Sequence, residues 1–109
     1  PKALGTAVAI ETGRRIGHAL PIPEDSIAIC SFGDASANHA TALAGFNAAR
    51  YSAKRGNPTP ILFLCEDNGI GISVATPTGW IAESFGNLPG LTYVRAEGDL
   101  CALHAAVQR

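Results

Sequence analysis

The sequence predicts an α/β fold in which an open parallel sheet is flanked by helices. Segments with a helical spacing of apolar residues alternate along the chain with short runs that are apolar throughout. Such runs are typical of strands in parallel sheets, which are joined by right-handed helical crossovers. Two of the runs also end in glycine-containing turns with oxygen-bearing side chains, and ligands bind at this carboxyl edge of a parallel sheet.

The length of the chain allows one domain at most. Of its 109 residues, 47% are hydrophobic and 16% are charged, which is an apolar balance for a small soluble monomer. We therefore expect residues 1–109 to form a single partial domain, truncated at both ends. Its surplus apolar surface would be buried against another chain or against further parts of the same protein.

The first predicted elements are a helix over residues 3–16 and a strand over residues 26–32. The helix is rich in alanine and other small residues, which allow close packing against a sheet or a second subunit. Pro21 and Pro23 end this helical pattern. The strand contains four consecutive apolar residues without polar alternation, and this run indicates burial.

The longest helical pattern covers residues 38–55. Phe46 and Ala49 fall on one face of it, and Arg50, Lys54 and Arg55 gather toward its C-terminal end, where positive charge suits the helix dipole. The remaining predicted elements are a strand over residues 61–65, a short helix over 81–85, a third strand over 91–94 and a last helix over 100–107.

The turns that follow the first two predicted strands carry the side chains best suited to chemistry. Asp34 offers a carboxylate and Asn68 an amide oxygen, and Mg²⁺ binds to oxygen ligands of these kinds. The N–H groups of Ala35 and Ser36 lie near the start of the next helix, where phosphate oxygens are bound, and Gly33 permits close approach. These residues fit a metal-bound diphosphate, and they equally fit a turn in which Asp34 only caps the following helix.

Composition restricts the partners and the location of the protein. A net charge of −1 gives no electrostatic reason to expect nucleic acid or a membrane as partner. No segment approaches the ~20 apolar residues that cross a bilayer, and no signal peptide is visible. Cys30, Cys65 and Cys101 are odd in number and widely spaced, as in reduced proteins, so we expect a cytoplasmic location.

The two turns and their surroundings resemble a known family. Gly33-Asp34-Ala35, a helical interval and then Asp67-Asn68 follow the pattern of enzymes that depend on thiamine diphosphate. The wider sequence is similar to the E1 alpha component of the 2-oxoacid dehydrogenase complexes, and this resemblance spans nearly the whole chain. It implies the thiamine-diphosphate-binding, transketolase-like fold, here truncated.

The resemblance also implies roles for individual residues. Asp34 and Asn68 match the side-chain ligands of Mg²⁺, and Ile70 matches the residue whose backbone carbonyl completes the protein ligands. The residues that match the turn against the diphosphate are Gly33, Ala35 and Ser36. Ala35 stands where the family pattern has glycine; if that position requires a positive φ, alanine is disfavoured there by roughly 1 kcal/mol. No residue of this chain matches a catalytic residue of the family.

The function implied by the resemblance is oxidative decarboxylation of a 2-oxo acid, with transfer of the acyl group to a lipoyl-bearing E2. The implied partners are an E1 beta subunit or a fused pyrimidine-binding domain, in a dimer or heterotetramer. Because essential groups come from that partner, we expect the 109-residue segment alone to be inactive. Two alternatives stay open: a transketolase-like or acetoin-cleaving enzyme, favoured by Asp67, and a non-catalytic module whose cofactor motif has decayed at Ala35.

Four further residues are assigned structural roles. We expect His39 to be a solvated histidine at the start of a helix and Glu66 to make a structural hydrogen bond. Trp80 and Phe85 are predicted to be core or interface residues rather than groups that stack on a cofactor.

Overall fold

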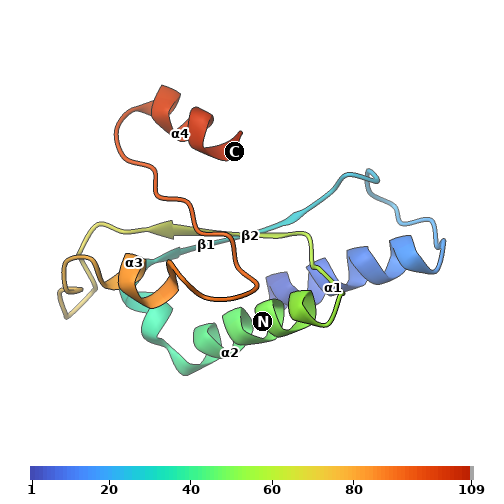
Figure 1. Ribbon diagram of the computed structural model, residues 1–109, viewed down its shortest axis with the longest axis horizontal. Helices are drawn as coiled ribbons and strands as arrows, with labels where there is room; N and C mark the ends of the chain where they lie inside the picture. The colour runs from blue at the N-terminus through green and yellow to red at the C-terminus, as the bar shows by residue number, and fades with distance from the viewer. Residues whose placement is uncertain (109) are drawn as a thin grey trace.

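The computed structural model describes residues 1–108 as a small α/β unit around two parallel strands. In chain order its elements are α1 (Lys2–Arg15), β1 (Ala28–Gly33), the 3₁₀ helix η1 (Asp34–Asn38), α2 (Ala40–Lys54), β2 (Ile61–Glu66), α3 (Trp80–Phe85) and α4 (Leu100–Val107). Helices α1 and α2 lie on one side of the two strands, and α4 stands apart on the other side (Figure 1). The predicted helices and the first two strands are therefore confirmed to within two residues at each end.

The two strands pair in parallel over their whole length. Their register runs from Ala28 opposite Ile61 to Gly33 opposite Glu66, so both strands end at the same edge of the sheet. This arrangement confirms the predicted parallel pairing. It also places the turns that follow Gly33 and Glu66 next to each other, as a ligand site at the carboxyl edge requires.

Only one face of this sheet is covered. Ile29 is 60% exposed and Leu64 is 49% exposed, while the alternate residues Phe32 and Phe63 pack into the core. The prediction of strands buried on both faces is thus wrong within this chain. The reason is that α1 and α2 cover the same side, and α4 has no buried residue.

The core is centred on Phe46 of α2. Its ring lies 5.2 Å from that of Phe32, 4.8 Å from that of Phe63 and 5.1 Å from that of Phe85, measured between centroids. Tilted and edge-to-face pairs of this kind add about 0.5–1.5 kcal/mol each beyond the area they bury. The cluster binds α2 and α3 to the sheet, and it confirms Phe85 as a core residue.

The third predicted strand, at residues 91–94, is absent. Half-buried and exposed residues alternate in this segment, as they would in a strand: Leu91 and Tyr93 are half-buried, and Thr92 and Val94 are exposed. The Tyr93 side chain packs against the Phe46 cluster, but the backbone pairs with no strand. The spacing of apolar residues indicates which side chains face the core. A strand also needs the edge of a neighbouring strand for its backbone hydrogen bonds.

None of the helices in residues 1–108 combines the length and the apolar character needed to span a membrane.

Candidate functional site

The turn after β1 holds a carboxylate that is completely buried. Asp34 is the first residue of η1 and has an exposed fraction of 0%. Its Oδ1 accepts a hydrogen bond from the Ala35 N–H at 2.6 Å. Its Oδ2 accepts one from the Gly69 N–H at 2.7 Å, in the loop after β2. The carboxylate therefore joins the two turns that the sequence singled out.

This contact tests the interpretation of Asp34 as a helix cap. The first residues of α2 are capped by His39, whose Nδ1 accepts from the Thr41 N–H at 3.2 Å. Asp34 instead bonds to its neighbour Ala35 and to a loop 35 residues away in sequence. The capping alternative for Asp34 is thus wrong, and His39 is the solvated residue at a helix start that the sequence predicts.

Asn68 is the second residue of the loop after β2, and its side chain folds back on that loop. Asn68 Oδ1 accepts from the Ile70 N–H at 3.0 Å, and Gly69 between them has a φ of 74°, a conformation that favours glycine. Ile70 then forms an isolated antiparallel bridge with Ala75. The amide oxygen of Asn68 and the carboxylate of Asp34 are in this way held by consecutive backbone groups of one loop.

The two turns are also in close steric contact. A Cβ atom at Gly71 would lie 2.9 Å from the Cβ of Ala35 and 2.6 Å from the carbonyl oxygen of Val74, so only glycine fits there. Ala35 itself has an ordinary backbone, since no non-glycine residue in the described part of the chain has a positive φ. The cost of roughly 1 kcal/mol that a positive φ would impose on alanine at position 35 is therefore absent.

The donor atoms at this edge fit a hard cation. Each oxygen of Asp34 accepts one N–H and keeps further acceptor capacity, and Asn68 is exposed. The bridge uses the carbonyls of Gly69 and Val74, which leaves the Ile70 carbonyl outside it. A carboxylate, an amide oxygen and a backbone carbonyl are the ligands that Mg²⁺ takes in proteins. In this conformation the loop shields Asp34 from solvent, so a cation that binds it must displace that cover.

The space around Gly33, next to Asp34, is open. A Cβ atom built on Gly33 meets no atom within 4 Å, although Gly33 adopts an ordinary extended backbone. Ser36 is exposed on the same 3₁₀ helix. The N–H of Ala35 is occupied by Asp34, so its predicted bond to a phosphate oxygen stays a prediction.

Negative charge is concentrated at this edge of the sheet. The pKa of the Cys65 thiol is raised to about 11, first by burial and then by the charges of Asp67, Asp34 and Glu66. A negative potential that disfavours a thiolate favours a bound cation. Across residues 1–108, no three His, Cys, Asp or Glu side chains gather as a metal-binding group. A metal here would therefore depend on amide and carbonyl oxygens besides Asp34.

The sequence comparison identifies a family. The family model of the dehydrogenase E1 component matches residues 3–108. The chain belongs to the dehydrogenase E1 component family. Neither a curated protein nor a solved structure matches it. Members of the E1 family are thiamine-diphosphate-dependent components of 2-oxoacid dehydrogenases, and the buried Asp34 and the Asn68 loop lie within the matched residues.

Other side chains near this candidate site have structural roles. The Ser31 hydroxyl donates to Glu66 Oε1 at 3.5 Å across the two strands, which agrees with the hydrogen bond predicted for Glu66. Trp80 Nε1 donates to Asn38 Oδ1 at 2.8 Å and ties the start of α3 to the end of η1. This tie was not predicted, because nothing in the sequence pairs two residues 42 positions apart.

Gly69 and Gly71 are the two site residues that sequence reasoning left without a role. The Gly-Ile-Gly pattern around Ile70 could have indicated that both glycines have a role in the loop. Gly69 supplies the N–H that holds Asp34, and Gly71 makes room for Ala35.

Proposed function

We propose that this chain is the part of an E1 alpha component that binds the diphosphate of thiamine diphosphate through Mg²⁺. The observation that carries the proposal is the 2.7 Å hydrogen bond from Gly69 to Asp34, which joins the turns after β1 and β2 at one edge of the sheet. Ligands bind at this edge in open α/β sheets. The negative charges of Asp67, Asp34 and Glu66, which add to burial in raising the pKa of Cys65, support a cation at the same place.

In this proposal each residue has a binding role rather than a catalytic one. Asp34 and Asn68 bind Mg²⁺ through their side chains, and Ile70 binds it through its carbonyl. The diphosphate lies against the turn formed by Gly33, Ala35 and Ser36. Thiamine diphosphate, when bound, supplies the electron sink for decarboxylation of a 2-oxo acid. The residues of this chain neutralise charge and orient the cofactor.

The proposal extends to the assembly in which the chain works. An E1 beta subunit or a fused pyrimidine-binding domain would provide the remaining half of the site, in a dimer or heterotetramer. The acyl group would pass to a lipoyl-bearing E2 in the cytoplasm. The segment alone would then show no decarboxylation of 2-oxo acids, and measurable turnover by the isolated chain would contradict this.

A second candidate is a transketolase-like or acetoin-cleaving enzyme, favoured by the acidic side chain of Asp67, which is exposed beside Asn68. The whole enzyme separates the two by its acceptor. Acylation of a lipoyl domain supports the E1 proposal, whereas transfer of a two-carbon ketol group to an aldehyde supports the alternative.

The cofactor proposal is tested by calorimetric titration of the full-length protein, with its partner half, using thiamine diphosphate and Mg²⁺. Asn68→Ala should weaken Mg²⁺-dependent binding at least tenfold, because one of three protein ligands is lost. The matched control is Asn87→Ala, an exposed asparagine outside the site, which should bind as the unmodified protein does. Equal affinity in Asn68→Ala and in the unmodified protein would refute the proposed ligand set.

A further inference from the structure

A hollow on α2 lies away from the carboxyl edge of the sheet. It has a volume of about 130 Å³ and is lined by Asn47, Arg50, Tyr51, Lys54 and Pro89. Arg50 lies ten residues after the first residue of α2, which corresponds to about 15 Å along the helix. The hollow is therefore separate from the turn at Asp34.

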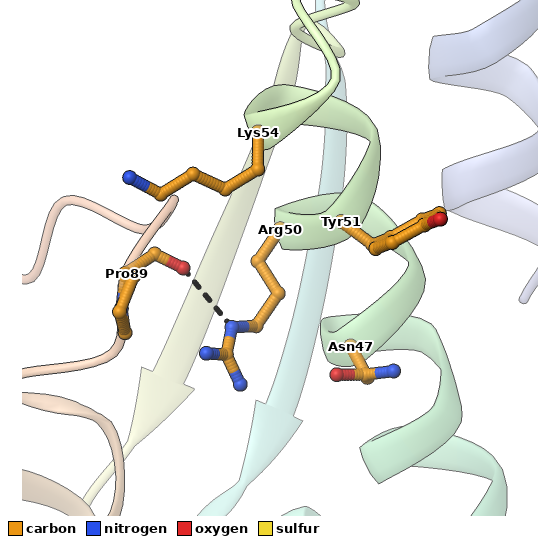
Figure 2. Close-up of a pocket in the computed structure, with 5 residues that line it drawn as sticks. All are labelled: Asn47, Arg50, Tyr51, Lys54 and Pro89. Carbon is orange, nitrogen blue, oxygen red and sulfur yellow. Dashed lines mark hydrogen bonds between the residues drawn. The ribbon is translucent and has the colours of Figure 1, made fainter.

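Two cationic side chains meet at this hollow. Arg50 and Lys54 are four residues apart on α2, and Figure 2 shows both extending toward Pro89, while Tyr51 points to the other side of the helix. Asn47 lies one turn before Arg50 on the same face. Like charges at this spacing repel each other by about 0.2–0.5 kcal/mol in an isolated helix. An anion placed between them would turn this repulsion into attraction.

The protein does not supply that anion from the described residues. The ion pairs within residues 1–108 join Glu11 to Arg14 and Arg15, and Arg95 to Glu97. None of them involves Arg50 or Lys54. The C-terminal dipole of α2 offsets part of the positive charge, but it acts along the helix axis and not within the hollow.

The guanidinium of Arg50 is fixed in place. Its Nε donates to the Pro89 carbonyl at 3.0 Å, and the side chain is half-buried. The next residue, Gly90, has a φ of 85°, and a Cβ atom there would lie 2.7 Å from the Arg50 carbonyl oxygen. The loop is thus packed directly on the helix. Because Nε is used by Pro89, the terminal nitrogens of Arg50 remain available for a ligand.

We propose that the face of α2 formed by Asn47, Arg50 and Lys54 binds a phosphate group. A planar guanidinium fits two phosphate oxygens, an ammonium adds charge, and the Asn47 amide adds a neutral donor. The hollow has room for one such group and not for a large ligand. This inference does not depend on the proposed cofactor role, since it uses other residues at another place.

The test uses the fact that the chain has two lysines, Lys2 and Lys54. The full-length protein is treated with an amine-acylating reagent, with and without inorganic phosphate at constant ionic strength, and acylation of each lysine is followed by mass spectrometry. Phosphate should slow acylation of Lys54 saturably and leave Lys2 unchanged. The proposal would be overturned if acetate at the same ionic strength slowed the acylation of Lys54 equally. It would also be overturned if phosphate did not slow this acylation at all.

Variants of α2 distinguish a specific phosphate site from nonspecific attraction by positive charge. Arg50→Gln should weaken the protection of Lys54 by phosphate roughly three- to fivefold, the size expected for an exposed charge pair. Arg55→Gln makes the same change of charge on the same end of the helix, where Arg55 lies over Tyr51, and should keep the protection. Asn47→Ala, at an exposed position, should weaken it without affecting the fold. An equal loss in all three variants would contradict the proposal.

Discussion

Replacement of Asp34 by asparagine is the sharpest test of how the two turns are held together. Both carboxylate oxygens accept backbone N–H groups, from Ala35 at 2.6 Å and from Gly69 at 2.7 Å, and the side chain has no exposed surface. Asparagine has the same shape, but one of its two positions is an NH₂ group, which donates and does not accept. One N–H of the turn must therefore lose its partner at a position without exposed surface.

The expected loss of stability follows from those two contacts. A hydrogen bond to a charged group contributes about 1.5–3 kcal/mol, and a buried donor left without a partner costs about 1–3 kcal/mol. Because the loop can relax in part, we expect Asp34→Asn to lower the free energy of unfolding by about 2–4 kcal/mol. Relief of repulsion from the nearby Asp67 and Glu66 offsets little of this, since both are exposed.

Denaturant unfolding of the full-length protein measures this loss, and amide hydrogen exchange at Gly69 locates it. Asp67→Asn is the matched control, because it removes the same charge from an exposed neighbouring position, and its stability should change by less than about 0.5 kcal/mol. If Asp34→Asn behaves like this control, and Gly69 keeps its protection against exchange, the carboxylate does not join the two loops.

Three further outcomes follow from the packing and the pKa values. Phe46→Ala removes the ring that three other aromatic residues contact, and should lower the free energy of unfolding by about 3–5 kcal/mol in a denaturation curve. Gly71→Ala should cost about 1–3 kcal/mol, because its Cβ would lie 2.6 Å from a backbone carbonyl, whereas Gly5→Ala in the open part of α1 should stabilise by up to about 1 kcal/mol; a thermal melt compares them. The pKa of Cys65 is raised from 9.0 to about 11, so its contribution to stability is fully present below pH 9 and is lost as the pH rises toward 11. Cys65→Ala should abolish this alkaline loss in unfolding curves at pH 8 and pH 10.5, and an unchanged loss would contradict the assignment.

Much of the local structure could be predicted from the sequence, because it depends on neighbours along the chain. The helix at α2 follows from its apolar face, and α4 begins at Asp99, whose side chain accepts from the Ala102 N–H at 3.0 Å. The parallel pairing of β1 and β2 follows from the helix between them. The prediction of a third strand was wrong because a strand depends on a distant partner. Residues 91–94 have the alternating burial of a strand but no neighbouring strand to pair with.

The composition of the candidate site was determined by the sequence alone. Asp34 follows β1 directly and Asn68 is the second residue after β2, so parallel pairing is enough to bring their turns to one edge. The family match covers residues 3–108 and so includes both turns. Only the tertiary structure decided how these turns meet: Gly69 donates to Asp34, Gly71 makes room for Ala35, and Ala35 needs no positive φ. These are contacts between atoms about 35 residues apart, and their geometry depends on the packing of both strands and their loops rather than on any local preference.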